Sequence, residues 1–145
     1  MTKPTEGILL LNKPAGITSF RLVAILRRLT TVRKIGHAGT LDPFATGLMV
    51  MLIGKHYTRK SNSFINHDKA YKARLRLGQA TDTYDLDGAI TTQSDAIPSP
   101  AQIEEAVASQ QGEILQVPPM YSAKKVGGKK LYELARSGKV IERAP

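Results

Sequence analysis

The chain is organised around one punctuated segment, Gly36-His37-Ala38-Gly39-Thr40-Leu41-Asp42-Pro43-Phe44-Ala45-Thr46-Gly47. Its only carboxylate, Asp42, is one of two acidic residues within residues 1–67, against ten Lys and Arg residues. Nearby positive charge favours the ionised form of a carboxylate. A carboxylate would weaken the binding of a polyanion to this basic region, so Asp42 indicates a chemical role. The alternative interpretation is structural, because Asp-Pro commonly initiates a turn.

The residues before this segment predict a strand followed by a helix. Residues 7–11 form a short apolar run that leads into a turn over 12–16. Thr18 or Ser19 can cap the helix that follows. Its apolar positions recur at helical spacing: Phe20, Leu22, Val23, Ala24, Leu26 and Leu29. We therefore expect a helix with one apolar face and one basic face.

Beyond the segment, strands and helices continue to alternate. A second apolar run at 48–53, closed by Gly54, predicts a buried strand, and a short basic helix is expected over 56–65. Residues 69–77 alternate between apolar and charged side chains, which is the pattern of a strand with one buried face. An acidic loop is expected over 78–88.

The C-terminal part contains a further helix, a strand and a basic tail. Ser99 and Gln102 form a capping-box pattern at the start of a helix that is expected to end at Gly112. Another strand is predicted over 113–117, and a short helix over 130–137 follows a Gly-Gly turn. The sequence shows no internal repeat and no low-complexity linker. We therefore expect an α+β fold with a mixed, largely antiparallel sheet flanked by helices.

Charge is distributed unevenly along the 145 residues, whose net charge is +9. Residues 1–67 carry 10 basic and 2 acidic groups, residues 68–115 carry 4 and 8, and residues 116–145 carry 7 and 2. This asymmetry favours a nucleic-acid partner, and the alternative is a basic surface that is merely solvated. The absence of cysteine excludes disulfides and thiolate nucleophiles and fits a cytoplasmic protein. The longest apolar run is far shorter than the roughly 20 residues of a membrane-spanning helix.

Several nucleotide-binding and metal-binding motifs do not occur in the sequence. The glycines of 47–55 are spaced too widely for a phosphate-binding P-loop, and no G-x-G-x-x-G string is present. The acidic loop does not match a calcium-binding EF-hand, because Thr83 and Ser94 stand at two of its ligand positions. The three histidines lack the close spacing of a zinc site. We therefore expect neither a metal nor a cofactor.

Three features allow both a structural and an RNA-binding interpretation. Tyr71, on the apolar side of the strand predicted over 69–77, is either a core residue or a flat partner for a stacked base. His37 is either an ordinary loop histidine or part of a site around Asp42. The lysines of the tail are either solvated or bind phosphates; they are Lys124, Lys125, Lys129 and Lys130.

Four strings stand out in chain order: LLLNKPAGITS, GHAGTLDPFATGLMVMLIG, KAYKARLRLGQATDTYDLDG and VPPMYSAKKVGGKKLYELARSG. Together they resemble the N-terminal part of the TruB family of tRNA pseudouridine synthases, and the second string is highly specific. The resemblance implies isomerisation of a uridine in the T-loop of tRNA, at position 55, to pseudouridine. The C1′–N1 bond breaks, the uracil rotates, and a C1′–C5 bond forms. The enzyme implied is cytoplasmic and monomeric, and it needs no cofactor.

The resemblance also implies roles for individual residues. Asp42 would be the nucleophile, which attacks the ribose C1′ or the uracil C6, or assists glycal formation. His37 would enter the space that the flipped uridine vacates, and Tyr71 would stack on the uracil. Lys13 is grouped with the RNA-binding residues, together with the four tail lysines. Supporting roles would fall to Pro14, Gly39, Thr40, Leu41 and Asp82.

Finally, the resemblance implies the extent of the domain. Residues 1–145 are expected to be the N-terminal part of a catalytic domain, with a thumb-like basic segment at about 118–145 and no C-terminal PUA domain. Family members continue further and supply an active-site arginine that orients the nucleophile. We therefore expect a truncated chain that needs the missing half for activity. The alternatives are a non-catalytic RNA-binding module or tRNA chaperone, and a basic protein with a purely structural Asp-Pro turn.

Overall fold

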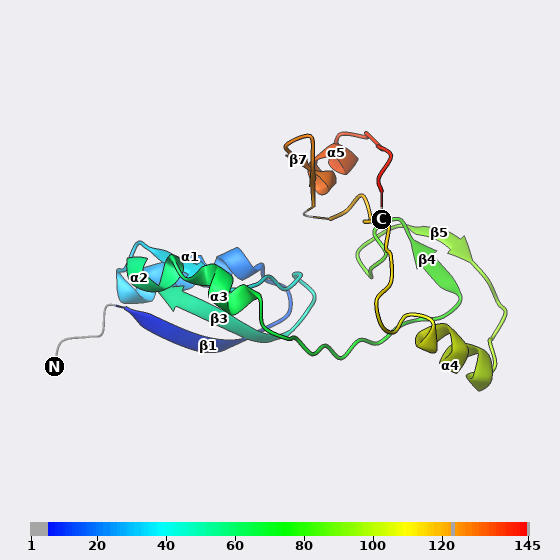
Figure 1. Ribbon diagram of the computed structural model, residues 1–145, viewed down its shortest axis with the longest axis horizontal. Coiled ribbons are helices and arrows are strands. Elements are labelled where there is room, and N and C mark those ends of the chain that lie inside the picture. The colour runs from blue at the N-terminus through cyan, green and yellow to red at the C-terminus, as the bar shows by residue number, and fades with distance from the viewer. Residues whose placement is uncertain (1–5, 123, 145) are drawn as a thin grey trace. The chain divides into compact units, whose positions relative to one another are not determined.

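Helices and strands alternate along the chain, as the sequence patterns predict (Figure 1). The computed structural model describes residues 6–122 and 124–144. The chain divides into two units, Met1–Lys72 and Ala73–Pro145, which are called unit 1 and unit 2 below. Within the described residues the strands form three small sheets, and each pairing is antiparallel. The predicted α+β class is therefore confirmed.

Unit 1 is built on a three-stranded sheet. β1 (Gly7–Lys13) and β2 (Ile35–His37) both pair with β3 (Gly47–Ile53), which gives the strand order β1-β3-β2. The strands predicted from the two apolar runs are both present, and β1 continues as far as Lys13. The register places Lys13 opposite Gly47. The punctuated segment therefore starts in β2 and ends in β3, so its central loop lies beside the end of β1.

Helix α1 (Ser19–Thr30) packs against one face of this sheet. Its N-cap is Thr18, whose side chain accepts a hydrogen bond from the Arg21 backbone N–H at 3.1 Å. The helix contributes three buried residues, and the sheet contributes three more. Together these form the core of unit 1: Leu22, Val23, Leu26, Ile35, Met49 and Met51.

Two residues expected on the apolar face of α1 are exposed to solvent. Phe20 is 62% exposed and Leu29 is 68% exposed. Phe20 lies outside the narrow stripe that faces the sheet, and the guanidinium of Arg27 lies over its ring, 5.8 Å from the centroid. Leu29 belongs to the last turn of the helix. The apolar face predicted from helical spacing alone is therefore wider than the face of α1 that is buried against the sheet.

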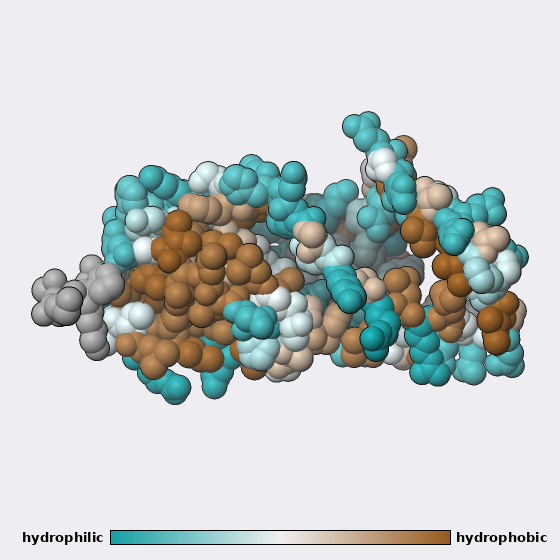
Figure 2. Space-filling view, turned by 90° about the horizontal axis from the view of Figure 1, so that it is seen from below, coloured by the Kyte–Doolittle hydropathy of each residue, from teal (hydrophilic) through white to brown (hydrophobic). Residues whose placement is uncertain are grey.

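The sheet face opposite α1 remains partly open. Side chains alternate along each strand, so Ile8, Leu10 and Leu48 lie on that face. Their exposed fractions are 44%, 61% and 65%. Figure 2 shows apolar side chains gathered over the part of the molecule that carries unit 1. An apolar surface of this kind is unusual for a complete domain.

The remainder of unit 1 departs from the sequence-based expectation. The single helix expected over 56–65 is two short helices, α2 (Lys55–Thr58) and α3 (Ser61–Ile65). The strand predicted over 69–77 is not formed, and residues 68–76 have no regular secondary structure. A strand needs a neighbour to pair its backbone N–H and C=O groups. No residue that the structure describes supplies that neighbour, although the alternating pattern is present.

Unit 2 contains two hairpins and two helices. The first hairpin pairs β4 (Gln79–Thr81) with β5 (Ile90–Gln93), and the acidic residues form its connecting turn. The second pairs β6 (Lys125–Val126) with β7 (Lys129–Lys130). The acidic loop expected over 78–88 is wrong at its start, where β4 forms, and the sequence patterns predicted no strand at β5. The strand predicted over 113–117 is wrong, since these residues pair with nothing in the described chain.

The two helices of unit 2 begin as predicted. α4 (Pro100–Ala108) has the full capping box: the Ser99 side chain accepts from the Gln102 N–H, and the Ser99 N–H donates to the Gln102 side chain. It ends before Gly112, which lies in the following loop. α5 (Leu131–Arg136) ends near Gly138, as predicted, where φ is +73°. In the described part of the chain, no helix is long and apolar enough to cross a membrane.

Candidate functional site

Asp42 lies at an exposed turn between β2 and β3. Its backbone carbonyl accepts a hydrogen bond from the Ala45 N–H at 3.1 Å, with Pro43 at the second position of the turn. This geometry is therefore compatible with both interpretations of Asp42, a chemical role and a purely structural role in the turn. None of the residues that the structure describes forms a hydrogen bond or an ion pair with the Asp42 carboxylate. The turn presents an unpartnered carboxylate at the surface of a basic unit.

Lys13 is completely buried and is the last residue of β1. Its ammonium group donates to three backbone carbonyls, those of Pro14 at 3.0 Å, Ile17 at 2.8 Å and Pro43 at 3.1 Å. A lysine ammonium has three donors, so its hydrogen-bonding capacity is fully used. Lys13 was expected among the RNA-binding residues. The structure instead assigns it to the interior, where it joins the turn after β1 to the residue that follows Asp42.

Ser19 is a second buried polar residue beside the Asp42 turn, with 3% of its surface exposed. Its Oγ accepts a hydrogen bond from the Leu41 N–H and donates to the Leu41 carbonyl, both at 3.0 Å. Leu41 directly precedes Asp42, so these two bonds hold the chain on the N-terminal side of the turn. Sequence reasoning considered Ser19 only as a helix cap. One sequence signal for this function was available: Ser19 directly follows Thr18, and a helix needs only one of the two hydroxyl residues as its N-cap.

The punctuated segment contains three further residues for which a role was expected: Gly39, Thr40 and His37. Gly39 has φ of +110°, a conformation that residues with a Cβ rarely adopt, so a glycine is required there. Thr40 is exposed. His37 ends β2 opposite Met51, and its Nδ1 is buried without a hydrogen-bond partner among the described residues. Most buried polar atoms have a hydrogen-bond partner, so this ring nitrogen is an exception among the described residues of unit 1.

Tyr71 is placed in the irregular stretch after α3. Its side chain is 72% exposed, so it is not a core residue in this structure. None of the aromatic contacts in the described chain involves it. The structural alternative of a buried ring on a strand face is therefore not observed. No hydrogen bond among the described residues joins Tyr71 to the Asp42 turn.

Asp82 closes the β4–β5 hairpin of unit 2. Its Oδ1 accepts a hydrogen bond from the Ala89 N–H at 2.9 Å, and its own N–H donates to the Ala89 carbonyl at 3.1 Å. Asp85 stabilises the same turn by accepting from the Thr83 hydroxyl and the Asp87 N–H. No group of acidic and histidine side chains that could hold a metal ion occurs among the described residues. Asp82 therefore has a local structural function in unit 2.

The β6–β7 hairpin presents the lysines of the tail. Lys124, Lys125 and Lys129 are exposed around the turn formed by two glycines with positive φ. Lys130 differs, because its Nζ donates to the Tyr132 hydroxyl at 3.1 Å. This hydrogen bond raises the pKa of the Lys130 ammonium above its ordinary value. The hairpin is therefore a compact positive surface of unit 2.

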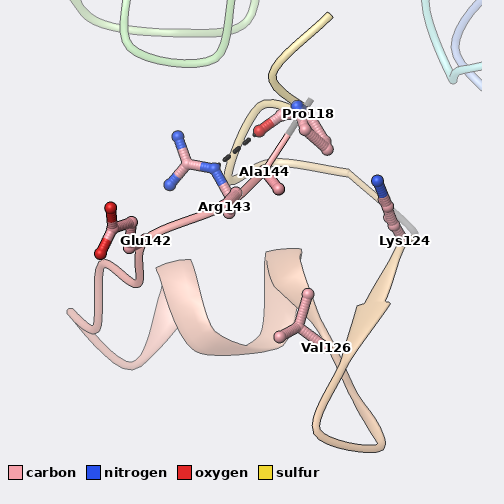
Figure 3. A pocket seen from close by; sticks show the side chains of 6 residues that line it. All are labelled: Pro118, Lys124, Val126, Glu142, Arg143 and Ala144. Atoms are coloured by element: carbon pink, nitrogen blue, oxygen red, sulfur yellow. Dashed lines mark hydrogen bonds between the residues drawn. The ribbon is translucent and has the colours of Figure 1, made fainter.

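A hollow of about 290 Å³ lies beside this hairpin in unit 2. Figure 3 shows Arg143 reaching across it, with Nε donating to the Pro118 carbonyl at 2.7 Å. Lys124 and Glu142 lie on its rim (Figure 3). A second hollow of about 200 Å³ is a shallow groove along the exposed side of α1. Asp42 lines neither of these two hollows, and its side chain is exposed on the turn.

Comparison with known proteins gives a consistent family. The TruB family of pseudouridylate synthases, N-terminal domain, matches residues 27–145. The tRNA pseudouridine synthase B of Protochlamydia amoebophila is 61% identical over 140 residues, which cover 97% of this chain and 53% of that protein. The protein of the same name from Chlamydia muridarum is 58% identical over 99% of this chain and 59% of its own length. The chain thus spans between half and two thirds of the length of these relatives.

Proposed function

Because the chain belongs to the TruB family of pseudouridylate synthases, we propose that it is the N-terminal part of a catalytic domain that converts a T-loop uridine of tRNA to pseudouridine. The name tRNA pseudouridine synthase B, carried by the relatives, supports tRNA as the substrate. In this proposal the enzyme is cytoplasmic and monomeric. Residues 118–145 act as a thumb-like segment that grips the RNA.

One observation carries the proposal: the Asp42 carboxylate is exposed on a turn whose neighbours on both sides are fixed by buried side chains. Such fixation is what a reacting group needs, since misplacement by about 1 Å can cost roughly 10²-fold in rate. Asp42 is the nucleophile of the proposed reaction. It attacks the ribose C1′ or the uracil C6, or assists glycal formation.

The proposed reaction requires no oxidant and no cofactor. The C1′–N1 bond breaks, the uracil turns, and C5 replaces N1 at C1′. The proton on C5 leaves to solvent, and N1 takes up a proton. The uridine must first leave the base stack. In this proposal His37 enters the space that the uridine vacates, and Tyr71 stacks on the flipped uracil. Lys124, Lys125, Lys129 and Lys130 bind phosphates in this proposal.

Release of tritium from a T-arm hairpin labelled at C5 of the target uridine tests the proposal. We define the extended chain as residues 1–145 followed by the C-terminal part of the Protochlamydia amoebophila relative that lies beyond the matched region. The extended chain is expected to release tritium, and Asp42→Ala is expected to abolish release without weakening hairpin binding. Release that survives Asp42→Ala would contradict the nucleophile.

The second candidate function is a non-catalytic RNA-binding module. The observation that favours it is the cluster of lysines on the β6–β7 hairpin of unit 2, since phosphate binding by these lysines would not require Asp42. This alternative predicts that the extended chain binds the T-arm RNA hairpin with steep salt dependence and releases no tritium from it. Measuring binding and release on the same preparation therefore separates the two functions.

A further inference from the structure

Ser19 is nearly buried, and its hydroxyl serves a single loop residue. Leu41 has no strand partner, yet its N–H and its C=O are both paired with Ser19 Oγ at 3.0 Å. A hydroxyl has one proton, which goes to the Leu41 carbonyl oxygen because the alternative acceptor, Met49 Sδ, lies at 3.8 Å and is a weaker acceptor. The Ser19 hydroxyl thus pairs the backbone N–H and C=O of Leu41, as a neighbouring strand would do in a sheet.

The two buried polar side chains act on opposite sides of Asp42. Ser19 holds the residue before it, and Lys13 holds the residue after it through the Pro43 carbonyl at 3.1 Å. The Gly16 N–H also donates to that carbonyl at 2.8 Å. Consequently the Asp42 backbone is fixed from both ends while its side chain stays exposed.

Helix capping does not explain why Ser19 carries a hydroxyl. Thr18 is the N-cap, and its side chain accepts the hydrogen bond from the Arg21 N–H. The Ser19 hydroxyl makes no bond within α1; its two short hydrogen bonds go to the loop 22 residues away along the sequence. We propose that Ser19 is a positioning residue that sets the orientation of the Asp42 carboxylate from the first turn of α1. This inference rests on the proposed function of Asp42.

The test compares Ser19→Ala with Ser19→Thr and with the control Thr18→Ala. Thr18→Ala weakens the same helix end but leaves the bonds to Leu41 in place. In the extended chain, Ser19→Ala is expected to lower kcat for tritium release roughly 10- to 100-fold while KM and hairpin affinity stay unchanged. Ser19→Thr, which keeps the hydroxyl, is expected to recover most of kcat. Thr18→Ala is expected to lower Tm and to leave kcat at the wild-type value.

A second measurement does not depend on activity. In the 145-residue chain, amide hydrogen exchange at Leu41 is expected to accelerate in Ser19→Ala and to remain slow in Thr18→Ala. The positioning function is overturned if Ser19→Ala keeps full kcat, or if Thr18→Ala lowers kcat as much. An inactive wild-type extended chain would instead overturn the proposed function, and the exchange rate of Leu41 would still decide whether Ser19 holds the loop.

Discussion

At the scale of single residues, the site depends on where polar groups are buried. The sequence shows Asp42 as an isolated acid, but it does not show that Lys13 is internal or that Ser19 faces a loop. Lysine is almost never fully buried unless its charge is satisfied. Three carbonyls arranged around one ammonium group meet that condition here, and they can be recognised only once the turn after β1 and the Asp42 turn lie together.

Replacing Lys13 by methionine tests its internal function. Lys13→Met keeps the apolar stem but removes the donor to three carbonyls, so the free energy of unfolding is expected to fall by about 2–3 kcal/mol. Urea unfolding of the 145-residue chain measures it. The control is Lys34→Met, because Lys34 is exposed and is expected to change stability by less than about 0.5 kcal/mol. Equal effects of the two substitutions would show that the buried hydrogen bonds contribute nothing.

At the scale of elements, the best predictions came from local chemistry. The Ser99 capping box and the Gly-Gly turn are set by neighbouring residues, and both are present. The strand predicted at 48–53 is also present, because β1 and β2 pair with it on its two sides. The strands predicted over 69–77 and 113–117 depend on a partner elsewhere in the chain. A correct alternating pattern does not pair a strand by itself, and this is why both predictions failed.

The β6–β7 hairpin makes a prediction about RNA binding. Its exposed lysines surround the Gly-Gly turn, and each phosphate contact that they make contributes to counterion release. Replacing Lys125 and Lys129 together by alanine is expected to reduce the slope of log K against log salt by about two, because each lysine contributes close to one. Fluorescence titration of a labelled T-arm hairpin measures the slope. The control Gln111→Ala, a neutral exposed position, is expected to leave it unchanged.

If the slope of log K against log salt is the same in the double lysine variant as in the wild type, the β6–β7 hairpin does not contact the phosphates of the RNA. A loss of affinity with the slope intact would point to altered folding of unit 2. Circular dichroism of both variants distinguishes that case from the loss of phosphate contacts.

At the scale of the whole molecule, the sequence predicted the fold class and the central loop, but not which surfaces are covered. Apolar residues on both strands β1 and β3 suggested burial on each side of the sheet. Instead Leu10 and Leu48 remain more than half exposed, as does Leu115 in unit 2. Hydrophobicity indicates that a residue is suited to burial, whereas its actual burial depends on what packs against it. The chain spans about half of the length of the relatives it matches.

The central claim is that Asp42 reacts and does not merely shape its turn. Asparagine distinguishes these functions, because Asn initiates turns as aspartate does but is not a carboxylate nucleophile. The decisive measurement is the single-turnover rate of tritium release from the T-arm hairpin by the extended chain with Asp42→Asn. We predict no release, with wild-type hairpin affinity and wild-type Tm. Release at the wild-type rate would contradict the account and would make Asp42 a structural turn residue.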